Sequence, residues 1–201
     1  MLVWDAIYER LTYDGFVHHE PTVLAPDLRD RTFIVNGFSK TFSMTGWRLG
    51  YVIAPVPFIE AMDNFQSHTT SGATTFAQAA AVEALKLPQS AIDEMVSTFD
   101  GRRRRMLELL SEIPNVTCPS PQGAFYAFPN FSHYIGMQFN GKVIADDLAL
   151  TAFLLEEGRV ALVPGSAFGA PGFMRLSYAT GMKAIEEGLR RTAEALKKLS
   201  R

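Results

Sequence analysis

Two short apolar runs stand out in the first part of the chain. Residues 32–36 and 50–54 are rich in β-branched and aromatic side chains and are bounded by turn residues, which is typical of buried strands. Pro55 and Pro57 end the second run, and proline is well tolerated in the first turn of a helix. The spacing of apolar residues over 58–66 then predicts that helix.

Helical patterns dominate the middle of the chain. The polar residues 69–72 interrupt the first helical pattern, and Thr75 is the expected N-cap of an Ala-rich helix that ends near Pro88. Apolar residues at helical spacing predict a long helix over 90–110. Such a helix is long enough to leave one domain and enter another.

Short strands and helices alternate after Pro114. The predicted strands are 115–118, 123–128, 160–163 and 174–178, and the predicted helices are 142–156 and 183–199. The chain is therefore predicted to be α/β, with part of an α/β domain over 1–88, a connecting helix over 89–111 and a small α+β domain over 112–201.

Composition limits the classes of function. The 201 residues are 47% hydrophobic and 20% charged, with a formal net charge of -2, which argues against a nucleic-acid or anionic-membrane surface as the main function. The single cysteine, Cys118, rules out an internal disulfide framework and fits a reducing compartment such as the cytoplasm. No apolar run approaches membrane-spanning length, so we expect a soluble protein.

The segment from Gly37 to Gly50 carries the most informative chemistry. Lys40 follows the first predicted strand, and Arg48 comes eight residues later among small residues. A lysine amine forms a Schiff base with an aldehyde cofactor, and the planar guanidinium of arginine suits bidentate binding of a phosphate. Gly46 and Gly50 would let the backbone come close to a bulky ligand. The alternative is a lysine and an arginine on the surface of a turn.

Over its fourteen residues this segment resembles the cofactor-lysine signature of class I and II aminotransferases, which have fold type I and use pyridoxal 5′-phosphate (PLP). By this resemblance, Lys40 forms the Schiff base and carries a proton between substrate and cofactor, and Arg48 binds the cofactor phosphate. The implied reaction moves an amino group from an amino acid to a 2-oxo acid. The run from Met44 to Arg48 is most similar to the aspartate/aromatic branch of the family.

A second match lies 35 residues before Lys40, where Asp5 is followed by Tyr8. A PLP enzyme needs a carboxylate at the pyridine nitrogen, because the protonated ring is the electron sink. In the family, an Asp-x-x-Tyr motif supplies this carboxylate and a phenol near the ring hydroxyl, so the resemblance makes Asp5 and Tyr8 cofactor-binding residues. An N-capping Asp and a core Tyr are the alternative. The family often has Glu where this chain has Ala6.

A third match places an arginine on a late strand. A Gly-rich loop, 163–169, precedes the predicted strand that carries Arg175. An arginine fork is a natural partner for the α-carboxylate of an amino acid, and in the family the matching arginine binds it. The alternative is an arginine in a surface ion pair.

The resemblance covers only the C-terminal half of such a protein. Residues 1–4 begin as though a strand had been cut, so the true start is expected to be missing. The absent half would supply a phosphate-binding helix N-terminus, and position 37 is Gly where some relatives have a phosphate-binding Ser. We therefore expect an exposed strand edge, weak PLP binding and poor transamination by the chain alone, and a homodimer at full length.

Two rival interpretations remain. A PLP-dependent lyase or synthase of the same fold would be expected to differ around Arg48 and often to carry His at position 8. A non-catalytic fragment would be expected to have lost some of the matching residues. Two further patterns are assigned no site: the basic run 102–105 is expected to be a solvated helix face, and the histidines lack metal-ligand spacing, so no metal site is predicted (His18, His19, His68 and His133).

Overall fold

The computed structural model describes residues 1–201, which form two compact units, Met1–Val96 and Ser97–Arg201. The boundary between them falls within one long helix, α4 (Gln89–Ser111). This helix confirms the one predicted over 90–110, whereas the proposed division into domains stays a prediction. Each unit is described by itself below.

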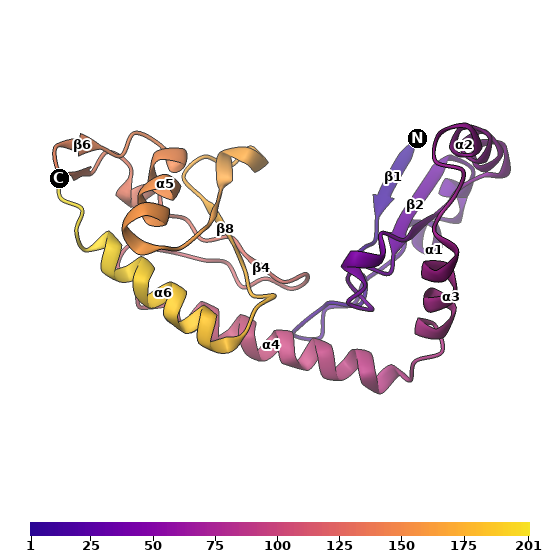
Figure 1. Ribbon diagram of the computed structural model, residues 1–201, viewed down its shortest axis with the longest axis horizontal. Coiled ribbons are helices and arrows are strands. Elements are labelled where there is room, and N and C mark those ends of the chain that lie inside the picture. Colours follow the sequence, from indigo (N-terminus) through magenta and orange to yellow (C-terminus); the bar gives the residue numbers. More distant parts are fainter. The chain divides into compact units, whose positions relative to one another are not determined.

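The first unit is built on a three-stranded sheet in the order β1-β2-β3. Figure 1 labels its strands β1 and β2. Strand β1 runs parallel to β2, and β2 runs antiparallel to β3. Its elements are β1 (Leu2–Asp5), α1 (Pro21–Leu24), a 3-10 turn (Pro26–Arg31), β2 (Thr32–Gly37), a 3-10 turn (Thr45–Trp47), β3 (Gly50–Ile53), α2 (Val56–Thr69) and α3 (Thr75–Ala84).

A small apolar cluster anchors the loop that follows β2. Phe38 and Met44 are 7% and 8% exposed and pack with Ala81 and Ala84 of α3. Removing a side chain of this size from water contributes about 1.5–3 kcal/mol. The two ends of the segment 38–44 are thus fixed to α3, and Lys40 lies between them.

The first unit also exposes much apolar surface. Strand β1 is an edge of the sheet, as predicted. Val3 of β1, Ile53 of β3, Phe65 of α2 and Phe76 of α3 are each more than half exposed. Large exposed apolar side chains are a feature of surfaces that contact other chains.

The second unit packs two helices against small sheets. Helix α6 buries Ile185, Leu189 and Leu196 on one face, and it lies so close to α5 that a Cβ added to Gly158 would meet Ala195 Cβ at 3.4 Å. The sheets have the orders β4-β8-β7 and β5-β6. The elements are β4 (Tyr126–Ala127), a 3-10 turn (Ser132–Tyr134), β5 (Gln138–Phe139), β6 (Lys142–Val143), α5 (Asp147–Gly158), β7 (Val163–Pro164), a 3-10 turn (Gly165–Phe168), β8 (Met174–Ser177) and α6 (Met182–Leu196).

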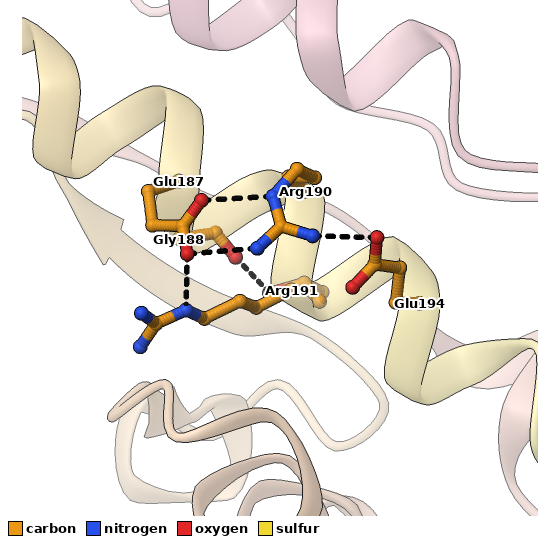
Figure 2. Close-up of polar contacts among 6 residues, drawn as sticks. Glu187, Gly188, Arg190, Arg191 and Glu194 are labelled. Carbon is orange, nitrogen blue, oxygen red and sulfur yellow. Dashed lines mark hydrogen bonds and ion pairs between the residues drawn. The ribbon is translucent and has the colours of Figure 1, made fainter.

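The exposed face of α6 carries a network of ion pairs (Figure 2). Glu187 accepts hydrogen bonds from Arg190 and Arg191, and Arg190 also donates to Glu194 at 2.6 Å. These bonds lower the pKa of Glu187 to about 2. The partners are three or four residues apart, which is the spacing of neighbours on a helix surface.

The predicted strands over 32–36 and 50–54 are confirmed as β2 and β3, and the strand over 174–178 is confirmed as β8. The predicted helices 58–66 and 183–199 are confirmed as α2 and α6, with shifted ends.

Other predictions about local structure were wrong. Thr75 is the first residue of α3 rather than its N-cap, and the N-cap Thr74 makes no side-chain capping bond. Residues 115–118 form only an isolated bridge, Thr117 with Asn130, because no longer partner strand runs beside them. The strands predicted over 123–128 and 160–163 shrink to the two-residue strands β4 and β7.

The helix predicted over 142–156 starts later than expected. Asn140 and Gly141 have φ of 49° and 75°, the left-handed pair that closes a tight hairpin, so Lys142 lies in β6 instead. Helix α5 begins only after Asp146, whose carboxylate accepts a hydrogen bond from Ala149 N at 2.7 Å.

The basic run 102–105 is not a uniformly solvated face. Arg103 is 2% exposed, forms an ion pair with Asp100 and donates to Ser120 Oγ and the Pro121 carbonyl at 2.9 Å each. It therefore ties α4 to the loop before β4. None of the helices combines the length and apolarity that spanning a membrane requires.

Candidate active site

Lys40 lies directly beyond the end of β2. The side chain of the buried Asn36 accepts a hydrogen bond from Gly37 N at 2.7 Å, where the strand ends. The chain then turns, with Ser43 N donating to the Lys40 carbonyl at 3.3 Å. The Lys40 side chain is half-buried, and its Nζ lies 5.9 Å from the centre of the Tyr8 ring. Two of the predicted site residues, Lys40 and Tyr8, therefore lie close together.

Asp5 lies at the end of the neighbouring strand. Because β1 and β2 are parallel, their carboxyl ends meet at the same edge of the sheet, where Asp5 pairs with Val35. Asp5 Oδ1 accepts a hydrogen bond from Ile7 N at 3.1 Å, which bends the chain. The turn that follows places Tyr8 beside Lys40, so Asp5, Tyr8 and Lys40 occupy one edge.

Arg48 follows the 3-10 turn Thr45–Trp47 and has φ 53° and ψ 47°, in the left-handed region. Residues with a side chain adopt this region rarely and at a cost in free energy. The guanidinium donates to the Thr45 carbonyl at 2.8 Å, is exposed and forms no ion pair. Its remaining N–H groups are accessible to an anion.

The two glycines of the motif have different surroundings. A Cβ on Gly50 would meet the Asn36 carbonyl at 2.9 Å, so the close approach of β3 to β2 requires glycine at this position. A Cβ on Gly46 would meet nothing within 4 Å. The close approach of the two strands accounts for Gly50, and the expectation that Gly46 and Gly50 make room for a ligand stays a prediction.

Arg175 belongs to the second unit, in β8. Its guanidinium carbon lies 4.5 Å from the centre of the Tyr126 ring and 4.6 Å from that of Phe168. The side chain is half-buried and forms no ion pair with a carboxylate of the chain. Contact with aromatic rings fixes a guanidinium without occupying its N–H groups, which stay able to bind a carboxylate.

Asp147 and Gly165 hold the turn that carries Phe168, and neither was assigned a role from the sequence. Asp147 is 2% exposed, and its Oδ2 accepts a hydrogen bond from Ser166 N at 2.6 Å. Burial opposes ionisation of this carboxyl group, but the hydrogen bonds from Ser166 outweigh it and lower its pKa. A Cβ on Gly165 would lie 2.2 Å from the Ala170 carbonyl oxygen, so only glycine fits there. The Gly-rich loop signalled the second residue but not the first.

Comparison with known proteins supports the same family. The family model for aminotransferase class I and II matches residues 1–195. The chain is 45% identical to an aspartate aminotransferase from Streptomyces avermitilis, over 96% of this chain and 47% of that protein. It is 43% identical to a probable aspartate/prephenate aminotransferase from Aquifex aeolicus, over 98% of this chain and 49% of that protein.

Solved structures agree. The aspartate aminotransferase from Rhizobium meliloti has a TM-score of 0.94 at 43% identity, with 98% of this chain and 50% of that chain covered. The aromatic aminotransferase from Pyrococcus horikoshii has a TM-score of 0.88 at 40% identity, with 98% and 51% covered. The chain thus spans about half the length of the curated relatives it matches, and over that span it has the mixed α/β structure of fold type I. It belongs to the class I and II aminotransferases.

Proposed function

We propose that this chain provides the cofactor lysine and the carboxylate-binding arginine of a PLP-dependent aminotransferase. The observation that carries the proposal is the edge of the first unit's sheet, where Lys40 Nζ lies 5.9 Å from the Tyr8 ring and Asp5 ends the adjacent parallel strand. Family membership supports the reaction class, and the spacing of these residues supports the assignment of their roles.

The residues at this edge fit the chemistry of PLP. The cofactor combines an aldehyde, a basic ring nitrogen, a ring hydroxyl and a phosphate. A lysine, a carboxylate, a phenol and an arginine are the partners that these groups need, and Lys40, Asp5, Tyr8 and Arg48 supply them. Neither Asp5 nor Arg48 is engaged in an ion pair, so both charges are available to a ligand.

When bound, PLP supplies an electron sink that makes the substrate Cα–H bond acidic. Asp5 would hold a proton at the ring nitrogen, and Tyr8 would donate a hydrogen bond to the ring oxygen. Arg48 would bind the phosphate. Lys40 would hold the cofactor covalently, and its amine, once released, would accept the Cα proton as a general base.

Arg175 would bind the α-carboxylate of the substrate through the N–H groups that its two aromatic contacts leave accessible. The names of the relatives favour aspartate and aromatic amino acids as donors. We further propose that the whole protein is a homodimer, as membership of the family implies.

An absorbance titration of the 201-residue chain with PLP tests this function. We expect a band that differs from free PLP, appears only at high PLP concentration because binding is weak, is absent in Lys40→Ala and decreases slowly when aspartate is added. Lys86→Ala is the matched control, because Lys86 lies just after α3 and is paired with Glu83 at 2.7 Å, away from the edge. A band that survives in Lys40→Ala, or is lost equally in Lys86→Ala, would contradict the proposal.

A further inference from the structure

Three metal-ligating side chains meet in the first unit, outside the proposed cofactor site. One ligand atom each of Glu9, His18 and Glu20 lies within 4.8 Å of the other two. The side chains of His18 and Glu20 are 22% and 25% exposed, so the cluster is half-buried yet open to solvent. It is small enough for a single ion to contact all three residues.

Two separate segments bring the cluster together. Glu9 lies in the turn after β1, where its N–H donates to the Ala6 carbonyl at 2.9 Å. His18 and Glu20 lie in the segment before α1, two residues apart, and His18 Nε2 is 3.0 Å from Glu20 Oε1. His19, between them, is exposed and takes no part in the cluster.

The charges of the cluster are not balanced by the chain. Neither Glu9 nor Glu20 forms an ion pair with a lysine or arginine, and His18 is the only basic partner of Glu20. Glu20 Oε2 is buried and has no hydrogen-bond partner. A buried carboxylate oxygen without a partner is costly, and two neighbouring carboxylates repel, so a bound cation would relieve both.

We propose that Glu9, His18 and Glu20 bind one divalent transition-metal ion. One imidazole nitrogen and two carboxylates suit zinc and its neighbours in the first transition row, with water in the remaining position. The ion would tie the turn after β1 to the segment before α1. The proposal departs from the sequence-based expectation of no metal site, which considered only the spacing of histidines and not the carboxylates that fold beside them.

Zinc binding to the 201-residue chain, measured by calorimetry without PLP, tests the site independently of the proposed function. We expect one Zn²⁺ per chain. His18→Gln and Glu20→Gln should each weaken Zn²⁺ binding by about tenfold or more. Substituting a residue that only hydrogen-bonds to a metal ligand already costs about tenfold in affinity. His19→Gln is the control and should bind as the unsubstituted chain does.

A second measurement uses the unsubstituted chain and so does not depend on whether the ligand variants fold. The Trp4 ring centre lies 6.0 Å from that of His18, so Co²⁺ in the site should quench Trp4 fluorescence with the same stoichiometry, and Zn²⁺ should reverse it. Trp47→Phe removes the only other tryptophan and should leave the quenching by Co²⁺ unchanged. The proposal is overturned if the chain takes up no Zn²⁺, if His18→Gln binds it unchanged, or if His19→Gln weakens binding as much as His18→Gln does.

Discussion

Arg48 and Ser43 both hold φ 53°, although neither is glycine. Such a conformation costs free energy and is retained where the surrounding structure or the function requires it. Arg48 also gives up one N–H to the Thr45 carbonyl, which orients its guanidinium. The side chain is thus held in a fixed direction while the backbone is strained. Both features are expected of a residue that binds an anion.

We expect Arg48→Gly to separate stability from cofactor binding. Glycine tolerates φ 53° without strain, so the free energy of unfolding should change by no more than about 1 kcal/mol. PLP affinity, followed by the Lys40-dependent band, should fall by about tenfold or more, because a charge-assisted contact to phosphate is lost. The control is Ser43→Gly, which relieves the same conformation and should leave PLP binding unchanged. Equal PLP binding by Arg48→Gly and the unsubstituted chain would exclude Arg48 as the phosphate ligand.

Asp147 should stabilise the turn Gly165–Phe168, whose Phe168 contacts Arg175. Asp147→Ala leaves the half-buried Ser166 N–H without its acceptor, which we expect to lower the free energy of unfolding by about 1–3 kcal/mol. Asp147→Asn keeps an acceptor oxygen and should lose less. Urea unfolding measures the free energy of unfolding of both variants. An equal loss in both would show that the hydrogen bond to Ser166 does not stabilise the fold.

Individual residues differed in how well the sequence revealed them. Lys40 and Arg48 share one short motif, and Asp5 with Tyr8 forms another, so local pattern was enough to select them. Asp147 was missed because its partner Ser166 lies 19 residues away and only the fold brings the two together.

At the scale of elements, α6 offers a test of electrostatics. Hydrogen bonds from Arg190 and Arg191 lower the pKa of Glu187 from 4.5 to about 2. A carboxyl group with a depressed pKa in the folded state stabilises the fold above its unfolded pKa, and this contribution is lost as the pH falls through its folded pKa.

The stability of Glu187→Gln, compared with that of the unsubstituted chain by thermal unfolding, should therefore depend on pH. The variant should be slightly less stable above pH 4.5, and the two should converge as the pH falls toward 2. The difference should be small, because exposed pairs are screened by water and salt. A difference in stability between the two proteins that grows as the pH falls would contradict the stabilising role of the Glu187 ion pairs.

The hairpin of β5 and β6 rests on its turn. Gly141 has φ 75°, so Gly141→Ala should destabilise the chain by about 1 kcal/mol through left-handed strain. Gly188 lies inside α6, where alanine is favoured over glycine, and a Cβ there would meet nothing within 4 Å, so Gly188→Ala is the control and should not destabilise the chain. Chemical denaturation compares the two, and a smaller loss for Gly141→Ala would contradict the turn assignment.

Elements were predicted well where periodicity or β-rich composition was strong, as in α4 and β2. They were predicted poorly where the strands have two residues, since pairing in β4 and β7 depends on β8 as a partner and not on their own sequence. The Asn140-Gly141 turn signal was present in the sequence, but the helical pattern after it concealed the hairpin.

At the scale of the whole molecule, the chain carries proposed site residues in both units, with Asp5, Tyr8, Lys40 and Arg48 in the first and Arg175 in the second. Family and fold type could be inferred from sequence because the motifs extend through both units. The amino donor could not, because the matched motifs are assigned to the cofactor and to the α-carboxylate, which all amino-acid substrates share.

The central claim is that Lys40 is the cofactor lysine, and trapping tests it most directly. The chain is mixed with excess PLP and reduced with borohydride, and the modified lysine is located by peptide mass mapping. We predict that the label is concentrated at Lys40, because its amine lies beside Tyr8 at the edge of the sheet where β1 ends with Asp5. Label spread over the exposed lysines, such as Lys86 and Lys198, with no preference for Lys40, would contradict the account.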